Sequence, residues 1–233
     1  MRPAPVIDVV MPARDEAPTV AENVAAAIGC RYVREVIVVD DGSRDDTGER
    51  ATVAGAKVLR RETPDGSGSK ALAMALGVAA SDAAAILFVD ADCTGLGPAH
   101  LDAICEPFVA GRADMSVGAF DYGRFWNPQV RRWPPLSGER VVHRWVFEGV
   151  PPDKLDGYTI EVRLNEVIAE GRLPTTVRIM AGVTHRTKRD KLGPRKGYRE
   201  TWRMFWHLVG LPVRGVVRWR TCWFYLRELT VED

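Results

Sequence analysis

Several features that mark other classes of protein are missing from this sequence. The four cysteines are scattered, no Cys-x-x-Cys pair occurs, and no secretory leader is recognisable. This pattern disfavours a zinc site or a disulfide framework and favours reduced thiols in a cytoplasmic protein. No apolar run approaches the roughly 20 residues that cross a bilayer. The net charge is only +1, so nothing draws the whole molecule to nucleic acid. We expect no nucleic-acid partner, and a location in the cytoplasm or peripheral to the inner face of the membrane.

Apolar residues make up 46% of the 233 residues, which is enough for a substantial core in one large domain, or in one domain with an appendage. The chain alternates between strand-like and helix-like patterns. Strand-forming stretches occupy 6–11, 36–43, 56–60, 85–93, 114–120 and 176–180. Helices are expected from Pro18 to Gly29, from about Asp46, over 71–80, 98–110 and 157–171, and again from Tyr198. The order indicates a doubly wound α/β fold.

The first loop of this fold, after the strand that Pro12 closes, carries no Gly-x-Gly-x-x-Gly. That motif is the signature of a dinucleotide-binding fold, because its glycines let the backbone approach a pyrophosphate. Its absence removes the commonest alternative for a chain that begins with a strand, a short polar loop and a helix.

Two of the buried strands end in carboxylates: Asp40 and Asp41 follow one, Asp90 and Asp92 the other. In open α/β sheets, ligands bind in the crevice beyond the carboxyl ends of the strands. Asp90 and Asp92 repel each other unless a cation joins them, so Asp-x-Asp predicts a divalent metal bound through oxygen, with a substrate phosphate as co-ligand. A solvated turn after a strand is the competing interpretation.

Four further sites each have a functional and a structural interpretation. Lys70 follows a Gly/Ser loop and opens a helix, so it meets a phosphate or remains a solvated lysine. Ser137, Gly138 and Glu139 lie in a segment that we interpret as a loop closing over a ligand. Glu161 is either catalytic or a favourable first-turn acid. His185 leaves a strand and precedes a basic run, and it is either a ligand or a hydrogen-bonded structural residue.

Taken together, the motifs resemble those of the GT-A-fold glycosyltransferases of the family two type. The segments that carry this resemblance are Met-Pro-Ala-Arg-Asp-Glu (11–16), Val-Val-Asp-Asp-Gly-Ser-Arg-Asp-Asp-Thr (38–47) and Val-Asp-Ala-Asp (89–92). Segments 135–140, 157–161 and 182–186 are more loosely similar to the glucosyl-3-phosphoglycerate synthases, although this chain is shorter than those enzymes usually are.

The resemblance implies a GT-A fold, in which a Rossmann-like, mostly parallel sheet is flanked by helices. We expect a glycosyltransferase domain over 1–190, with a nucleotide-binding half over about 1–95 and an acceptor and sugar half over about 96–190. Residues 191–233 are expected to form a helical extension rich in basic and aromatic residues.

The resemblance also implies metal-dependent transfer of a sugar from a nucleotide diphosphate sugar, usually a UDP-sugar, to an acceptor such as a phosphoglycerate. Mg²⁺ or Mn²⁺ would be the cofactor. The residues it assigns to the nucleotide are Pro12, Ala13, Arg14, Glu16, Asp41, Ser43, Lys70, Asp90 and Ala91. It assigns the metal to Asp92 and His185, and catalysis to Asp92 and Glu161. Contacts with the sugar and acceptor would come from Leu136, Ser137, Gly138, Glu139, Tyr158 and Arg186.

Other interpretations stay open. The basic and aromatic residues from Arg186 to Trp223 suit a polyprenyl-phosphate acceptor at a membrane surface, and equally suit helices packed on the core or on a second copy of the chain. A non-catalytic sugar-nucleotide binder would share the same residues. A signalling receiver module also places aspartates at strand ends, but such modules are about half this length. Retaining and inverting stereochemistry are not distinguished.

Overall fold

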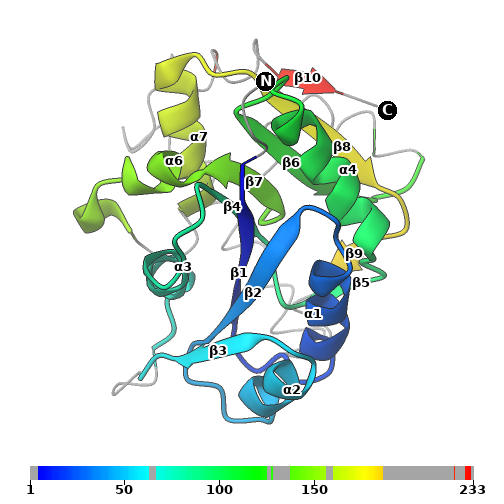
Figure 1. The fold of residues 1–233 in the computed structure, drawn as a ribbon, viewed down its shortest axis with the longest axis vertical. Coiled ribbons are helices and arrows are strands. Elements are labelled where there is room, and N and C mark those ends of the chain that lie inside the picture. The colour runs from blue at the N-terminus through cyan, green and yellow to red at the C-terminus, as the bar shows by residue number, and fades with distance from the viewer. Residues whose placement is uncertain are drawn as a thin grey trace, which may run out of the picture.

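The computed structural model describes residues 5–62, 67–124, 127, 137–155, 160–185, 223 and 229–231. Within them, the main sheet has the strand order β10-β8-β6-β7-β4-β1-β2-β3 (Figure 1). Its strands are β1 (Ile7–Ala13), β2 (Val33–Asp40), β3 (Lys57–Arg60), β4 (Ala85–Phe88), β6 (Met115–Phe120), β7 (Arg140–His143), β8 (Thr175–Met180) and β10 (Leu229–Val231). Neighbouring strands run parallel, except that β7 is antiparallel to β4 and to β6.

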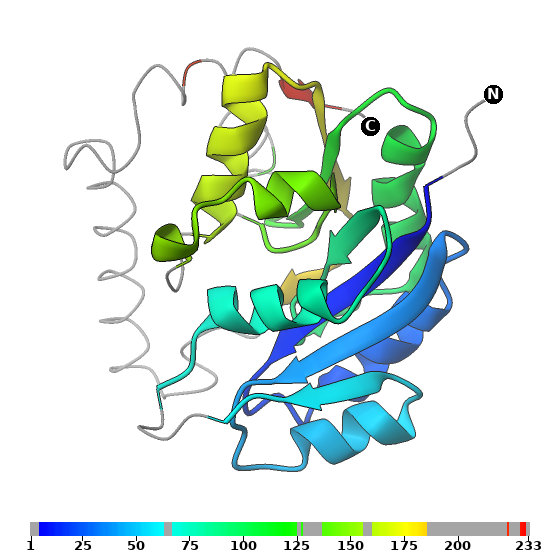
Figure 2. The ribbon, with the colours of Figure 1, turned by 60° about the vertical axis from the view of Figure 1, so that its left-hand side comes forward.

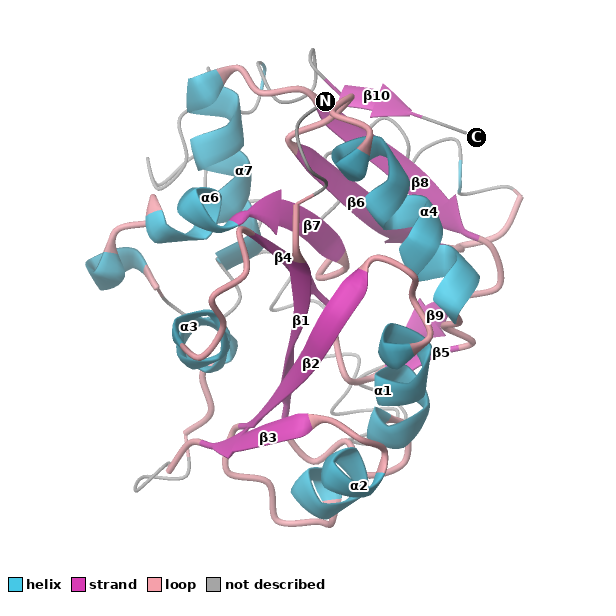
Figure 3. Ribbon diagram, viewed as in Figure 1, coloured by secondary structure: helices cyan, strands magenta, loops and turns pink. Residues whose placement is uncertain are grey.

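A second, two-stranded sheet pairs β5 (Cys93–Thr94) with β9 (Thr184–His185). The helices are α1 (Val20–Ile28), α2 (Thr47–Val53), α3 (Lys70–Ala79), α4 (Pro98–Val109), α6 (Arg144–Glu148) and α7 (Ile160–Gly171), with a 3-10 turn η1 (Pro152–Lys154). Figure 3 shows helices on both sides of the sheet. The prediction of a mostly parallel sheet flanked by helices is confirmed.

Both faces of the sheet are buried, which explains the unbroken apolar runs. On β1, Ile7 and Val9 belong to one core with residues of α1 and α4, whereas Val10 belongs to a second core with residues of α3, α6 and α7. On β4, Leu87 and Phe88 divide between the two cores in the same way. Successive side chains of a strand point to opposite faces, so a strand covered on both sides needs apolar residues at every position. Figure 2 shows α3, α6 and α7 on one side of the sheet and α1 and α2 on the other.

Several elements escaped the sequence analysis. Strand β7 and helix α6 follow a segment with two prolines and a glycine, which favoured a loop prediction there. Strands β5 and β9 have two residues each, too few for a periodic pattern. Strand β10 lies inside the predicted helical extension over 191–233, and it pairs with β8. Apart from Trp223 and β10, that extension lies outside the described residues. None of the helices that the structure describes has an apolar stretch long enough to cross a membrane.

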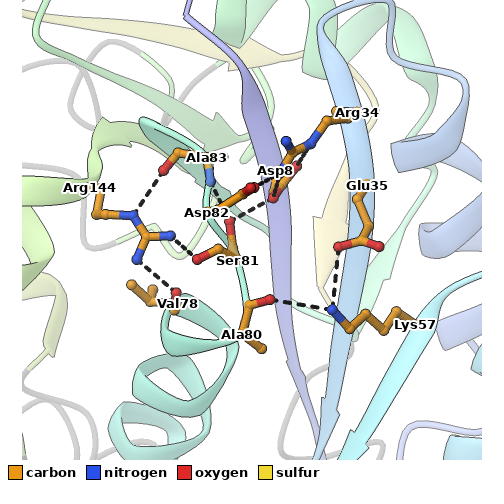
Figure 4. Close-up of polar contacts among 10 residues, drawn as sticks. All are labelled: Asp8, Arg34, Glu35, Lys57, Val78, Ala80, Ser81, Asp82, Ala83 and Arg144. Carbon is orange, nitrogen blue, oxygen red and sulfur yellow. Dashed lines mark hydrogen bonds and ion pairs between the residues drawn. The ribbon is translucent and has the colours of Figure 1, made fainter.

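The amino-terminal edge of the sheet carries a polar network whose members bind one another (Figure 4). Asp8 is fully buried on β1, accepts from Arg34 at 3.0 and 2.7 Å, and accepts from Ser81 Oγ at 2.6 Å. Arg144, at the start of α6, donates to the carbonyls of Val78 and Ala83, each at 2.9 Å, and to that of Ser81. A buried carboxylate needs such partners, and the last carbonyls of a helix lack partners within the helix. Arg144 thereby ties α3 to the β7–α6 segment.

We expect Arg144→Ala to lower the free energy of unfolding by about 2–3 kcal/mol, because it removes charge-assisted hydrogen bonds to three carbonyls in the last turn of α3 and in the segment that follows it. Arg144→Lys should recover only part of the loss, since an ammonium cannot reach three carbonyls as a guanidinium does. Arg31→Ala is the matched control: Arg31 is 64% exposed and pairs only loosely with Asp102, so about 0–1 kcal/mol is expected. Urea denaturation measures all three, and equal losses for Arg144→Ala and Arg31→Ala would contradict the role of Arg144.

Candidate active site

The carboxyl ends of β1, β2 and β4 lie at one edge of the sheet, because these strands are neighbours and parallel. Most of the residues predicted to bind the nucleotide lie here, in the last two residues of β1 (12–13) and in the loops 14–16 after β1, 41–43 after β2 and 90–92 after β4. The beginning of α3 adds Lys70 at the same edge, where its ammonium meets Asp90. The predicted site residues of the amino-terminal half therefore converge.

Hydrogen bonds from backbone amides join the segments that follow β1 and β2. The Asp41 amide donates to the Ala13 carbonyl at 2.8 Å, and the Asp15 amide donates to Ser43 Oγ at 3.0 Å. The Glu16 amide donates to Thr47 Oγ1 at 2.8 Å. Because these contacts join residues about thirty positions apart, the two loops form one unit, and Asp15 adopts a positive φ of 55° within it.

Asp41 is almost fully buried, at 4% exposure, and its carboxylate is already hydrogen-bonded. It accepts from Arg61 Nε, and it accepts from the Ser69 amide at 2.7 Å. The 67–69 segment lies so close that a Cβ on Gly68 would sit 2.8 Å from Asp41 Oδ2 and 2.2 Å from Arg14 Nη1. Arg14 and Asp41 are thus neighbours at a surface formed by three loops, where both were predicted to meet a nucleotide.

Lys70 joins two carboxylates from distant parts of the chain. Its Nζ lies 2.6 Å from Asp90 Oδ1 and 2.7 Å from Glu161 Oε1. Burial disfavours the charge on Lys70, but the two carboxylates outweigh it, and the pKa of Lys70 is raised. The three side chains remain 22%, 24% and 11% exposed, so a ligand can reach them. The ammonium, predicted to meet a diphosphate, already has two anionic partners.

Glu139 is a neighbour of Asp90 and is fully buried. Its carboxylate accepts from Ser137 Oγ, from Cys93 Sγ at 3.1 Å and weakly from the Asp90 amide at 3.4 Å. Burial and the nearby Asp90 carboxylate raise the pKa of Glu139 to about 7. Burial, followed by the charge of Glu139, also raises the pKa of the Cys93 thiol well above its ordinary value. These hydrogen bonds to Glu139 all come from protein donors. Its contact with sugar or acceptor stays a prediction.

Gly138 leaves room for the close approach of Asp90. A Cβ at this position would lie 2.3 Å from Asp90 Oδ2, so the Asp90 carboxylate would have to shift. Arg140, two residues further along, is fully buried and donates to the Ser137 carbonyl from Nε at 3.0 Å. Its Nη1 donates to the Glu161 carbonyl at 3.3 Å and to Asn165 Oδ1 at 2.8 Å. Arg140 therefore ties the 137–139 loop to the first turn of α7.

The two predicted metal ligands are brought near each other by the small sheet. Cys93, the residue after Asp92, pairs with His185 between β5 and β9. The His185 ring is exposed and packs on Phe120, with ring centroids 4.9 Å apart. Asp121 holds the turn before β9 by accepting from the Gly182 amide at 2.9 Å. Within the described residues, no group of three or more His, Cys, Asp or Glu side chains is arranged to hold a metal ion.

The 90–92 turn is also held from α1. Thr19 Oγ1 donates to the Ala91 carbonyl at 2.8 Å, and Asn23 Nδ2 donates to the carbonyls of Ala91 and Cys93, each at 3.0 Å. The sequence analysis missed these two residues, and it gave no individual role to Arg61, Asp121 or Arg140. Asn23 had a visible signal, since it is a polar residue on the apolar stripe that Val20 and Val24 define.

The predicted residues fall into three groups. Those around Asp41 join the loops after β1 and β2, and those around Lys70 join Asp90 to Glu161. Asp92 directly precedes Cys93, the residue that pairs with His185 in the small sheet. Pro12 and Ala13 are the last two residues of β1, and Ala91 lies in the loop after β4. Three predicted contacts to sugar and acceptor, Leu136, Tyr158 and Arg186, lie outside the described residues.

Comparison with known proteins agrees with this geometry. The model of the family "Glycosyl transferase family 2" matches residues 8–151. A glucosyl-3-phosphoglycerate synthase from Mycolicibacterium paratuberculosis is 36% identical over 121 residues, covering 49% of this chain and 36% of that protein. The synthase of Mycobacterium tuberculosis is 34% identical over 122 residues, covering 49% of this chain and 37% of that protein. The match thus spans little more than a third of these relatives.

Solved structures of the Mycobacterium tuberculosis synthase are similar over more of the chain. The complex with Mg²⁺ and uridine diphosphate superposes with a TM-score of 0.65 at 26% identity, covering 78% of this chain and 72% of that one. The complex with Mn²⁺, UDP-glucose and phosphoglyceric acid gives a TM-score of 0.63 at 26% identity with the same coverage. The family model covers more than half of the sequence, and the fold agrees with these neighbours; this chain belongs to glycosyl transferase family 2.

Proposed function

We propose that this chain transfers a sugar from a UDP-sugar to a small anionic acceptor, with Mg²⁺ or Mn²⁺ bound at the carboxyl edge of the sheet. The observation that carries the proposal is the acidic group around Lys70 in a member of glycosyl transferase family 2. UDP is suggested by the solved relatives, whose complexes contain uridine diphosphate with Mg²⁺ or Mn²⁺.

The charges at this edge explain why a metal would be needed. Lys70 brings one positive charge to the two carboxylates of Asp90 and Glu161. A diphosphate that approached this group would therefore meet a net negative charge, and at such short range the repulsion is weakly screened. A divalent cation removes this obstacle because it binds the protein carboxylate and the diphosphate together.

The donor atoms present fit Mg²⁺ or Mn²⁺. Asp92 supplies carboxylate oxygen and His185 an imidazole nitrogen from the paired strand, and both donor types suit Mn²⁺. Diphosphate oxygens and water would supply the remaining ligands. When bound, the ion would stabilise the negative charge that develops on the departing diphosphate. Asp41 and Arg14 would hold the nucleotide, and Lys70 would orient Asp90 and Glu161 toward the sugar.

The proposed acceptor is a small anionic molecule such as a phosphoglycerate, because a solved relative binds phosphoglyceric acid beside UDP-glucose. The alternative, a polyprenyl phosphate at a membrane surface, depends on residues 186–222, which lie outside the described residues. Turnover of UDP-glucose with 3-phosphoglycerate would support the first, and turnover only with a polyprenyl phosphate in vesicles would support the second. Binding of UDP-sugars without turnover of either would indicate a non-catalytic binder.

The first prediction separates metal binding from nucleotide binding. We expect Mn²⁺ to raise UDP affinity at least tenfold in the unmodified protein, and Asp92→Asn to abolish this gain and turnover. Asp41→Ala should weaken UDP binding by about 1–3 kcal/mol with and without Mn²⁺, since it loses a charged hydrogen-bond acceptor. Calorimetry measures both, with Asp82→Asn at the opposite edge as the matched control (86% exposed). A metal-dependent gain that persists in Asp92→Asn would refute the assignment.

The second prediction concerns Lys70 and Glu161. Lys70→Met should destabilise the protein by about 1–3 kcal/mol, because it leaves two neighbouring carboxylates without their shared cation. Adding Glu161→Gln should restore part of that loss, because the repulsion with Asp90 disappears. Urea denaturation of the two single variants and the double variant gives the coupling free energy. Additive losses would show that the pair does not interact in solution.

The third prediction concerns pH and Glu139. Its folded pKa of about 7 lies above the ordinary 4.5, so ionisation in the unfolded chain destabilises the fold as pH rises from about 4.5 to about 7. Relative to Glu139→Gln, the metal-free protein should lose up to about 3 kcal/mol over that range, at about 1.4 kcal/mol per pKa unit, and nothing further above it. Glu170→Gln, on the exposed end of α7, is the control. Parallel stability profiles for Glu139→Gln and the unmodified protein from pH 4.5 to 7.5 would contradict this.

A further inference from the structure

Two side chains of the α1 region hold the carbonyl groups of Ala91 and Cys93, the residues on either side of Asp92. Thr19 Oγ1 donates to the Ala91 carbonyl at 2.8 Å, and Asn23 Nδ2 spans the carbonyls of Ala91 and Cys93 at 3.0 Å each. Asp92 is the residue between those two carbonyls. Its backbone is therefore fixed from both sides by side chains that do not belong to the Asp-x-Asp motif.

Asn23 has features that packing alone does not explain. It is 1% exposed, on the face of α1 that carries Val20 and Val24. Within the described residues its Oδ1 has no hydrogen-bond partner. An unpaired buried acceptor lowers the stability of a fold, and an apolar side chain of the same size would avoid that cost. What asparagine provides here is the pair of N–H groups, and both are used on the turn.

The same contacts reach the second predicted metal ligand and the nucleotide loop. Cys93, whose carbonyl accepts from Asn23, pairs with His185 across the small sheet. On the other side, the Thr19 amide donates to the Glu16 carbonyl at 3.0 Å, at the end of the first loop. Thr19 and Asn23 thus lie where the first loop, the Asp92 turn and the His185 strand meet.

We propose that Thr19 and Asn23 are positioning residues for the metal–nucleotide complex. By holding the carbonyls of Ala91 and Cys93, they fix the direction of the Asp92 carboxylate and its separation from His185. The affinity for the cation in the presence of UDP then depends on both side chains, although neither touches the ligand. This inference rests on the proposed function, because it names the residues that support the same site.

The test compares variants in which the side chain at position 19 or 23 keeps or loses its hydrogen-bond donor and has nearly the same shape. Thr19→Val removes the hydroxyl donor, and Thr19→Ser retains it. Asn23→Leu removes both N–H donors together with the unpaired acceptor. Ser81→Ala is the control for loss of a buried hydrogen bond, since Ser81 Oγ donates to Asp8 at 2.6 Å at the opposite edge of the sheet. Thermal melting of each metal-free variant verifies that the variant folds, and it compares the loss of stability with that of Ser81→Ala.

The measured quantity is the dissociation constant of Mn²⁺ in saturating UDP, from electron paramagnetic resonance of free Mn²⁺. Thr19→Val should raise it about three- to tenfold and Asn23→Leu about tenfold or more, as expected for lost hydrogen bonds. Thr19→Ser and Ser81→Ala should stay within about twofold of the unmodified protein. UDP binding without metal should change little in any of them.

The outcomes separate the inference from the proposed function. The positioning role would be overturned if the unmodified protein binds Mn²⁺ with UDP and the folded variants Thr19→Val and Asn23→Leu bind it with the same affinity. The proposed function would then still stand. A loss of Mn²⁺ affinity in Ser81→Ala as large as that in Thr19→Val would also overturn the positioning role, because the loss would then follow from lower stability in general. Unmodified protein with no Mn²⁺-dependent UDP binding would overturn the proposed function, and the inference with it.

Discussion

Carboxylates gathered at one edge of a sheet repel one another, and each needs a compensating donor or cation. Here Lys70 compensates Asp90 and Glu161 at 2.6 and 2.7 Å, whereas Arg61 and the Ser69 amide compensate Asp41. These contacts fix the geometry of the edge. Ser69 and Lys70 are adjacent in the chain, and Ser69 binds Asp41 while Lys70 binds Asp90 and Glu161. The beginning of α3 is therefore the part of the chain on which the arrangement of the site depends. The contact with Glu161 also connects the amino-terminal strands to α7.

The two edges of the sheet differ in how their polar groups are satisfied. At the amino-terminal edge, Asp8 and Arg144 find their partners within the protein, and the network stabilises the fold. At the carboxyl edge the compensation is incomplete, because Lys70 serves two carboxylates and Glu139 is held with a raised pKa. A site for a cation and a diphosphate needs this imbalance, since fully paired carboxylates would gain little from a metal. The stabilising network and the proposed site thus lie at opposite ends of the same strands.

Much of this architecture followed from sequence. The apolar runs that end in Asp40 and Asp90 predicted buried parallel strands, because only strands covered on both faces need apolar residues at every position. The convergence of strand-end loops followed from the same argument. The pairing of Lys70 with Glu161 did not, because it joins residues 91 positions apart and no local pattern encodes such a contact. Strands β5 and β9 are too short to have a period, so the sequence could suggest His185 as a ligand but not its pairing with Cys93.

Two of the residues that the sequence analysis missed act on backbone: Asn23 binds two carbonyls of the Asp92 turn, and Arg140 binds the carbonyls of Ser137 and Glu161. Gly138, which the sequence analysis did name, acts by lacking a side chain where Asp90 approaches. A motif specifies which carboxylates are present, whereas residues of this kind specify where the carboxylates point. Because a metal–diphosphate complex is sensitive to ligand direction, two chains with the same Asp-x-Asp motif can differ in metal affinity through these supports alone.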